Sequence, residues 1–143
     1  MVKNKIRKSL LKQGQLFCQN DIEELNSQIQ KNVLKEIDIE SSKNTLLYFQ
    51  YKNEIPTNLI IDELLKYSNN IYMPRIVSEN ELKFNLFNEG ETLKKNKYGI
   101  DELMNEDYIN PKVLNTMFIP FVGIDKNCLL YTSDAADEPL SVV

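Results

Sequence analysis

The sequence predicts an α/β protein in which helices cover a parallel sheet, and three observations support this class. The chain has 143 residues, the usual length of one domain. Apolar residues make up 42% and charged residues 27%, a composition typical of globular proteins. Short, dense apolar runs of strand type alternate with a segment of helical periodicity, the order found in α/β folds.

Two helices are expected before the first strand. Apolar residues recur at helical spacing from Lys3 to Cys18. Asn20 is suited to cap a second helix, with Glu23 three residues later to complete a capping box. One apolar stripe then runs along this helix, made of Ile22, Leu25, Ile29, Val33 and Ile37. The remaining face is polar, so we expect both helices to lean on the sheet.

A strand–helix–strand unit follows. Residues Thr45–Phe49 form a dense apolar run that favours a buried strand, as in parallel sheets covered on both faces. Thr57 can cap a third helix, and Ile71–Met73 predicts a second strand that Pro74 ends. The core face of that helix is expected to be Ile60, Ile61, Leu64 and Leu65. A βαβ unit of this kind is strongly expected to have a right-handed crossover.

The remaining segments complete the sheet. Leu82–Phe87 alternates in polarity and predicts a strand with one polar face. Lys94–Glu102 is expected to be a loop in which Gly99 serves backbone geometry. Thr116–Pro120 is another short apolar run, predicted to be a buried strand.

Composition excludes several classes of function. The chain has no His, which removes His-based catalytic triads and nearly all zinc-enzyme sites. Its two cysteines, Cys18 and Cys128, do not suggest a disulfide framework. No apolar run reaches the length of about 18–20 residues that a membrane span needs, and no secretory signal is visible. We therefore expect a cytoplasmic protein with no membrane partner.

The charge distribution argues against nucleic-acid binding. Seventeen basic and twenty-one acidic residues give a net charge of −4, with basic residues gathered at the N-terminal end. This is not the broad positive footprint of a nucleic-acid-binding protein.

The basic N-terminal segment is the first candidate site. Lys3 and Arg7 are four residues apart and would share one helix face. Two cations one turn apart could hold two oxygens of a polyphosphate, Arg with a planar fork and Lys as a point charge. The alternative is an ordinary solvated basic turn.

Two further candidates follow predicted strands. Glu54 lies in the loop before the third helix, where a carboxylate could accept N–H bonds from a heterocyclic ligand. It could equally be a loop acid favoured by the helix dipole. Arg75 could face an anionic ligand or pair with a surface acid. The chain has no glycine-rich phosphate loop, CxxC motif or nucleophile elbow.

Together, these features resemble the 5-formyltetrahydrofolate cyclo-ligase family, also called 5,10-methenyltetrahydrofolate synthetases. No single motif is specific, but six occur in the family's order over residues 1–127. They are K-x-x-I-R at 3–7, E-x-x-T at 54–57, P-R at 74–75, K-F at 83–84, Y-G-I-D-E at 98–102 and F-I-P followed by I-D at 118–125.

The resemblance implies a three-layer α/β/α sandwich with a mostly parallel sheet. It implies an enzyme, a ligase, that closes the ring of 5-formyltetrahydrofolate with ATP, accompanied by Mg²⁺. The segment matching the family's nucleotide contacts is Lys3, Asn4, Lys5, Ile6 and Arg7. Phe49 and Glu54 match its folate contacts, and Arg75 is a weaker match. The catalytic residue is unassigned, and the protein is expected to act as a monomer.

The C-terminal segment departs from the family pattern. The family continues with a glycine-rich loop that would cradle phosphates, whereas no glycine follows Gly123 here. Residues 128–138 match the translation of a transposon end and adapter used to prepare sequencing libraries. We therefore expect an incomplete cyclo-ligase-like domain over residues 1–127 and an artefactual tail over residues 128–143. The magnesium ligands are expected in the missing part of the domain, and the chain itself is expected to be inactive.

Two other functions fit the same residues less fully. One is a non-catalytic α/β module that binds a nucleotide or a protein partner through its N-terminal helices. The other is a relative of sugar-phosphate isomerases or CoA-transferases. That class would need a catalytic acid at a switch point of the sheet and would not need Lys3 and Arg7 for ATP.

Overall fold

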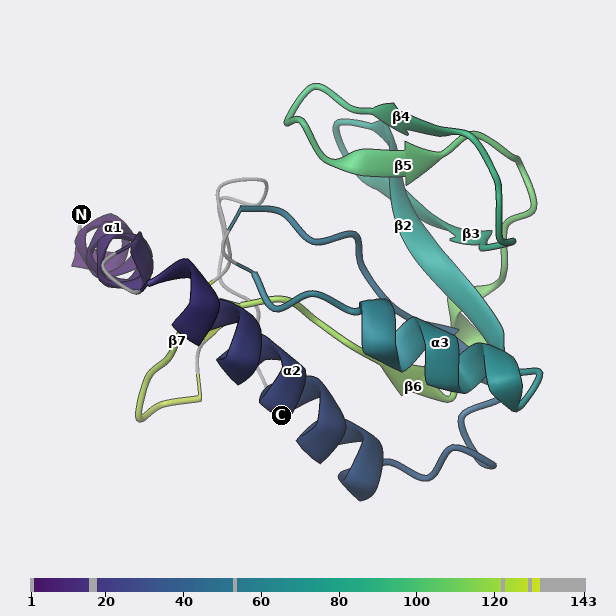
Figure 1. Cartoon of the computed structure of the whole chain (residues 1–143). Coiled ribbons are helices and arrows are strands. Elements are labelled where there is room, and N and C mark those ends of the chain that lie inside the picture. Colours follow the sequence, from purple (N-terminus) through teal and green to yellow (C-terminus); the bar gives the residue numbers. More distant parts are fainter. Residues whose placement is uncertain (1, 16–17, 53, 122, 129, 132–143) are drawn as a thin grey trace.

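The computed structural model describes residues 2–15, 18–52, 54–121, 123–128 and 130–131, and these have the predicted α/β architecture (Figure 1). A mixed, mostly parallel sheet has the strand order β3-β2-β1-β6. The strands are β1 (Asn44–Leu46), β2 (Asn70–Ser78), β3 (Glu81–Leu86) and β6 (Thr116–Met117). Strand β1 pairs in parallel with both β2 and β6, while β2 and β3 form an antiparallel pair.

The two N-terminal helices are confirmed as α1 (Val2–Gln15) and α2 (Gln19–Glu36). The prediction that Asn20 caps α2 is wrong, because Cys18 occupies the N-cap position and makes no side-chain cap bond. Gln19 is already helical, and its amide donates to the Glu23 carboxylate one turn later (3.1 Å). Glu23 therefore pairs along the helix and does not complete a capping box.

The predicted βαβ unit is present as β1, α3 (Asn58–Lys66) and β2. Strand β1 is shorter than expected, since residues 47–49 run on beyond its last paired residue. Thr57 stands at the N-cap of α3 as predicted, but its hydroxyl donates to the Tyr48 carbonyl (3.1 Å). The amides of Leu59 and Ile60 instead donate to the side chain of Gln30, which α2 brings across (2.9 and 3.4 Å).

Pro74 does not end β2, contrary to the sequence prediction. The Tyr72 carbonyl accepts from Leu47 on the β1 side. Backbone groups two residues apart in a strand point to the same side, so the nitrogen of Pro74 also faces that side. Pairing with β1 stops at Tyr72, so no neighbouring strand requires a donor at Pro74. The strand continues by pairing with β3 alone.

The segment predicted as a loop over Lys94–Glu102 is partly a hairpin. Strands β4 (Leu93–Lys95) and β5 (Asp101–Leu103) pair antiparallel, which confines the loop to residues 96–100. Gly99 has φ +81°, which confirms its expected conformational role. The remaining short elements are η1 (Pro111–Val113), β7 (Gly123–Ile124) and β8 (Leu130–Tyr131).

The two faces of the main sheet differ in their cover. Helices α2 and α3 lie on one side, and the core packs beneath them (Figure 1). Its buried members are Leu47, Ile60, Leu64, Ile71, Met73 and Leu103. In the part of the chain that the structure describes, no helix covers the other face, which carries Leu46, Pro74 and Phe84. A cavity opens on that face.

Candidate functional site

The cavity lies where β1 and β2 separate, at the carboxyl ends of β1 and β6. Its volume is about 310 Å³, which is the lower end of the range of small-molecule sites. Its apolar lining comes from five segments: Leu46, Leu47, Tyr48 and Phe49; Pro74 and Ile76; Leu82 and Phe84; Ile100; and Met117, Phe118, Ile119 and Pro120. In open α/β sheets, ligands bind beyond the carboxyl ends of parallel strands, so this is the expected position for a site.

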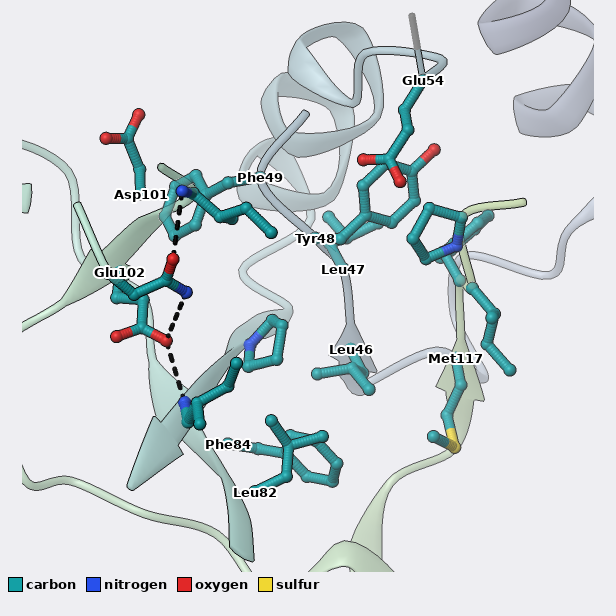
Figure 2. Close-up of a pocket in the computed structure, with 17 residues that line it drawn as sticks. Leu46, Leu47, Tyr48, Phe49, Glu54, Leu82, Phe84, Asp101, Glu102 and Met117 are labelled. Carbon is teal, nitrogen blue, oxygen red and sulfur yellow. Dashed lines mark hydrogen bonds between the residues drawn. The ribbon is translucent and has the colours of Figure 1, made fainter. Parts of the chain in front are cut away.

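The polar groups of the cavity stand on two opposite sides (Figure 2). Glu54 comes from the loop between β1 and α3, while Asn96, Asp101 and Glu102 come from the β4–β5 hairpin. All of these side chains can accept hydrogen bonds, and three of them are carboxylates. The arrangement suits an apolar, planar ligand that carries N–H donors.

Glu54 is held firmly in its loop. Its side chain is only 6% exposed, and Oε1 accepts a bond from the backbone N–H of Tyr51 (2.9 Å). The backbone N–H of Glu54 in turn donates to the Tyr51 carbonyl (3.1 Å). A buried carboxylate fixed this way is pre-oriented for recognition, because its position does not need to be ordered when a ligand binds.

Tyr48 braces the same loop and forms part of the cavity wall. Its hydroxyl donates to the Ile55 carbonyl (2.7 Å), and its own carbonyl accepts from the Thr57 hydroxyl (3.1 Å). Burial and the neighbouring Glu54 carboxylate raise the pKa of Tyr48 to about 12. The phenol therefore stays protonated and keeps donating across the neutral range.

The opposite wall is organised by Glu102, which is 8% exposed. Its Oε2 accepts from the backbone N–H of Ile76 on β2 (2.8 Å) and from the side-chain amide of Asn96 (3.1 Å). Asp101 beside it pairs with Lys95 at the hairpin surface (3.1 Å).

The structure places Phe49 and Glu54 in this one cavity, as two residues matched to folate contacts would require. Arg75 lies elsewhere. Its guanidinium donates to the Asn105 carbonyl (3.1 Å) and the Tyr108 hydroxyl (3.4 Å), and it does not line the cavity. Its neighbours give it a structural role in tying β2 to the segment after β5.

The five residues expected to hold the nucleotide lie on α1. Lys3, Asn4, Lys5 and Ile6 are exposed, whereas Arg7 is 6% exposed and its guanidinium donates to the Asn4 side chain (3.2 Å). Helix α1 lies beside the N-terminal end of α2, and the loop that carries Glu54 extends from the sheet toward that end (Figure 1). Within the described residues, none of α1 lines the cavity. The nucleotide assignment stays a prediction.

Comparison with known proteins decides the family. The model of the 5-formyltetrahydrofolate cyclo-ligase family matches residues 1–129. The chain belongs to this family. Among curated proteins, the cyclo-ligase of Haemophilus influenzae is 29% identical over 102 residues, which are 68% of this chain and 54% of that protein.

Solved structures of 5,10-methenyltetrahydrofolate synthetases share the fold of this cyclo-ligase family member. The Aquifex aeolicus protein superposes with a TM-score of 0.75 at 23% identity, over 91% of this chain and 66% of the other. The Mycoplasma pneumoniae protein gives 0.71 at 21% identity, over 94% and 73%. The chain spans about half the length of the curated relative.

Sequence reasoning missed most of the hairpin side of the site. Asn96, Asp101 and Glu102 line the cavity, yet the segment Tyr98–Glu102 was expected to be a loop without a role in the chemistry. The signal was present, because this segment is one of the six motifs that the chain shares with the cyclo-ligase family.

The described residues include neither a membrane-spanning helix nor a metal-binding cluster. No helix among them has the length and apolar character needed to cross a bilayer. They also contain no group of three or more His, Cys, Asp or Glu side chains placed to hold a metal ion.

Proposed function

We propose that this cyclo-ligase family member binds 5-formyltetrahydrofolate in the cavity between β1 and the β4–β5 hairpin and converts it to 5,10-methenyltetrahydrofolate with ATP. We further propose that the enzyme is cytoplasmic and acts as a monomer. One observation carries the proposal. A buried carboxylate, Glu54, stands at the rim of an apolar cavity at the strand ends, in a chain of this family.

The chemistry of a reduced pterin fits this cavity. The pyrimidine half of its ring system is flat and carries several N–H donors, while the reduced half and the attached aminobenzoyl ring offer apolar surface. Phe49 and the other apolar side chains can cover its faces. The Glu54 carboxylate is buried and can accept charge-assisted N–H bonds, which are stronger where the surroundings are apolar.

The proposed reaction joins two events on the formyl group. The formyl oxygen on N5 attacks the γ-phosphorus of ATP and ADP leaves. N10 then attacks the activated carbon and phosphate leaves, which closes the methenyl bridge and releases the N10 proton. Lys3 and Arg7 supply the cations proposed to meet the phosphates.

Magnesium is proposed only as the companion ion of ATP. The described residues include no cluster that could hold a metal, so no step is assigned to protein-bound magnesium. The sequence after Gly123 contains no glycine, so it lacks the glycine-rich loop that the family pattern places there to cradle phosphates. We therefore expect this chain to bind folate while turning over far more slowly than a cyclo-ligase with such a loop.

Calorimetric titration of the 143-residue chain with 5-formyltetrahydrofolate tests the proposal. We expect saturable binding, weakened about tenfold or more by Glu54→Gln, since a bond to a charged acceptor is worth roughly 1.5–3 kcal/mol. Glu40→Gln is the matched control, because Glu40 is an exposed loop acid outside the cavity. A chain that binds ATP but ignores folate would indicate the non-catalytic module.

Turnover is a separate measurement on the same samples. Methenyltetrahydrofolate absorbance is followed after ATP and magnesium are added. Formation at the rate of a cyclo-ligase that has the glycine-rich loop would contradict the expected loss of activity, although it would strengthen the assignment of the reaction.

A further inference from the structure

The β4–β5 hairpin forms one wall of the cavity but does not belong to the main sheet. Leu103 secures its base, since this side chain is 1% exposed and packs in the core under the helices. The next residue back along β5, Glu102, faces the other way, toward the cavity (Figure 2). The orientation of this wall therefore depends on what Glu102 contacts.

One carboxylate oxygen of Glu102 joins two parts of the wall. Oε2 accepts from Ile76 N–H on β2 (2.8 Å) and from the side-chain amide of Asn96 at the start of the loop (3.1 Å). Asn96 extends this contact into the loop, because its Oδ1 accepts from the backbone N–H groups of Tyr98 (2.9 Å) and Ile100 (3.1 Å). The bonds thus form a chain from Ile100 through Asn96 and Glu102 to Ile76, and dashed lines mark those that meet at Glu102 in Figure 2.

The backbone of β2 explains why an acceptor is needed at this point. Beyond Tyr72, no strand among the described residues pairs with β2 on the β1 side, and that side of the strand faces the cavity. Pro74 has no N–H to satisfy, but Ile76, two residues later, does. The Glu102 side chain satisfies this donor in place of a neighbouring strand. A single side chain thus links the edge of β2 to the hairpin.

We propose that Glu102 is a positioning residue that fixes the hairpin wall of the folate cavity by accepting these two hydrogen bonds. This inference rests on the proposed function. Glu102 acts through Ile76 and Asn96, and its negative charge is not what the ligand recognises. An uncharged acceptor of the same shape should therefore replace it.

Three variants of the full chain test this role. Glu102→Ala removes the acceptor, whereas Glu102→Gln keeps an oxygen that can accept from both Ile76 and Asn96. Glu91→Ala is the matched control. Glu91 also accepts two side-chain amide bonds, from Asn88 (2.6 Å) and Asn105 (2.8 Å), but it does not line the cavity.

The first readout is the affinity for 5-formyltetrahydrofolate. We expect Glu102→Ala to weaken binding about tenfold or more, and Glu102→Gln and Glu91→Ala to stay within about threefold of the unmodified chain. Equal losses for Ala and Gln would show that the charge itself is required and would overturn the positioning role. Unchanged binding by Glu102→Ala, or an equal loss in Glu91→Ala, would also overturn it.

The second readout is amide hydrogen exchange of the ligand-free chain, which tests the hydrogen bonds of Glu102 to Ile76 and Asn96 even if folate does not bind. We expect Glu102→Ala to accelerate exchange at Ile76 and over residues 96–103 about tenfold or more, with little change in Glu102→Gln or at the core amides of α3. Uniform acceleration, or none, would overturn the inference. An unmodified chain that fails to bind folate would instead contradict the proposed function.

Discussion

The two faces of the main sheet are built from alternate residues of the same strands but differ in burial and in what they contact. On the helix-covered face, Ile71 and Met73 are almost fully buried against α3. On the opposite face, Leu82 and Met117 are 52% and 50% exposed around the cavity. Because a strand has a period of two, neighbouring residues can serve separate purposes. Packing against helices stabilises one face, while the other lines the cavity that we propose binds folate.

The largest expected difference between the faces is in stability. Leu64→Ala on α3 should lower the free energy of unfolding by about 2–5 kcal/mol, because Leu64 is fully buried in the core. Leu82→Ala on the cavity face should change it by about 1 kcal/mol or less, since that side chain is half exposed. Urea unfolding measures both values.

Equal losses from these two variants would contradict the division between the faces. Binding of 5-formyltetrahydrofolate should show the reverse order. Leu82→Ala removes a cavity contact and should weaken binding, whereas Leu64→Ala should leave the affinity of the folded fraction nearly unchanged.

A smaller loss is expected at the junction between the two helices of the covered face. Gln30 is 2% exposed and accepts from the Leu59 and Ile60 amides while donating to the Asn58 side chain (3.1 Å). Gln30→Ala leaves these groups unsatisfied and should cost about 1–3 kcal/mol of stability.

Gln28→Ala is the control for this effect, because Gln28 is an exposed residue of α2 whose amide pairs only with Asn32 (3.2 Å). It should change stability by roughly 0.5 kcal/mol or less. If the two variants unfold at the same urea concentration, the capping of α3 by Gln30 contributes nothing measurable.

The covered face is also the part of the fold that the sequence predicted best. Apolar periodicity identified Ile60 and Leu64 as core residues, because burial follows residue type closely. The apolar run Thr45–Phe49 identified the buried strand β1 but not its end at Leu46. The cap at Asn20 and the end of β2 at Pro74 were wrong. The position of the cap and the end of the strand both depend on where neighbouring elements end, and the local sequence pattern does not carry that information.

The cavity was only half predictable for a similar reason. Glu54 and Phe49 follow β1 directly, so strand position and family motif together pointed to them. Glu102 acts through a bond to Ile76, 26 residues away, and no local pattern reveals that contact. Arg75 shares a strand with Ile76 but points to Asn105 and Tyr108, which only the register of β2 determines.

The smallest expected effect is a pH dependence at Tyr48, which connects the cavity wall to the loop of Glu54. Burial and the Glu54 carboxylate raise the pKa of Tyr48 from 10.0 to about 12 in the folded state. Below pH 10 both states hold the proton, so the contribution of Tyr48 to stability is fully present. Between pH 10 and about 12 the unfolded chain releases the proton first, so stability falls as the pH rises.

Tyr48→Phe removes this ionisation together with the bond to the Ile55 carbonyl, which should cost about 1 kcal/mol near neutral pH. The stability advantage of the unmodified protein over Tyr48→Phe should then disappear as the pH rises from 10 toward 12, as measured by urea unfolding at each pH. Tyr98→Phe, in the exposed loop of the hairpin, is the control for loss of a tyrosine hydroxyl near neutral pH, where it should cost roughly 0.5 kcal/mol or less. A Tyr48→Phe curve that stays parallel to that of the unmodified chain would mean that the Tyr48 phenol is not held in its buried, protonated form. The cavity wall beside Glu54 would then be open to water. In that case the cavity face of the sheet would not be pre-formed for a ligand, and its contrast with the packed, helix-covered face would be lost.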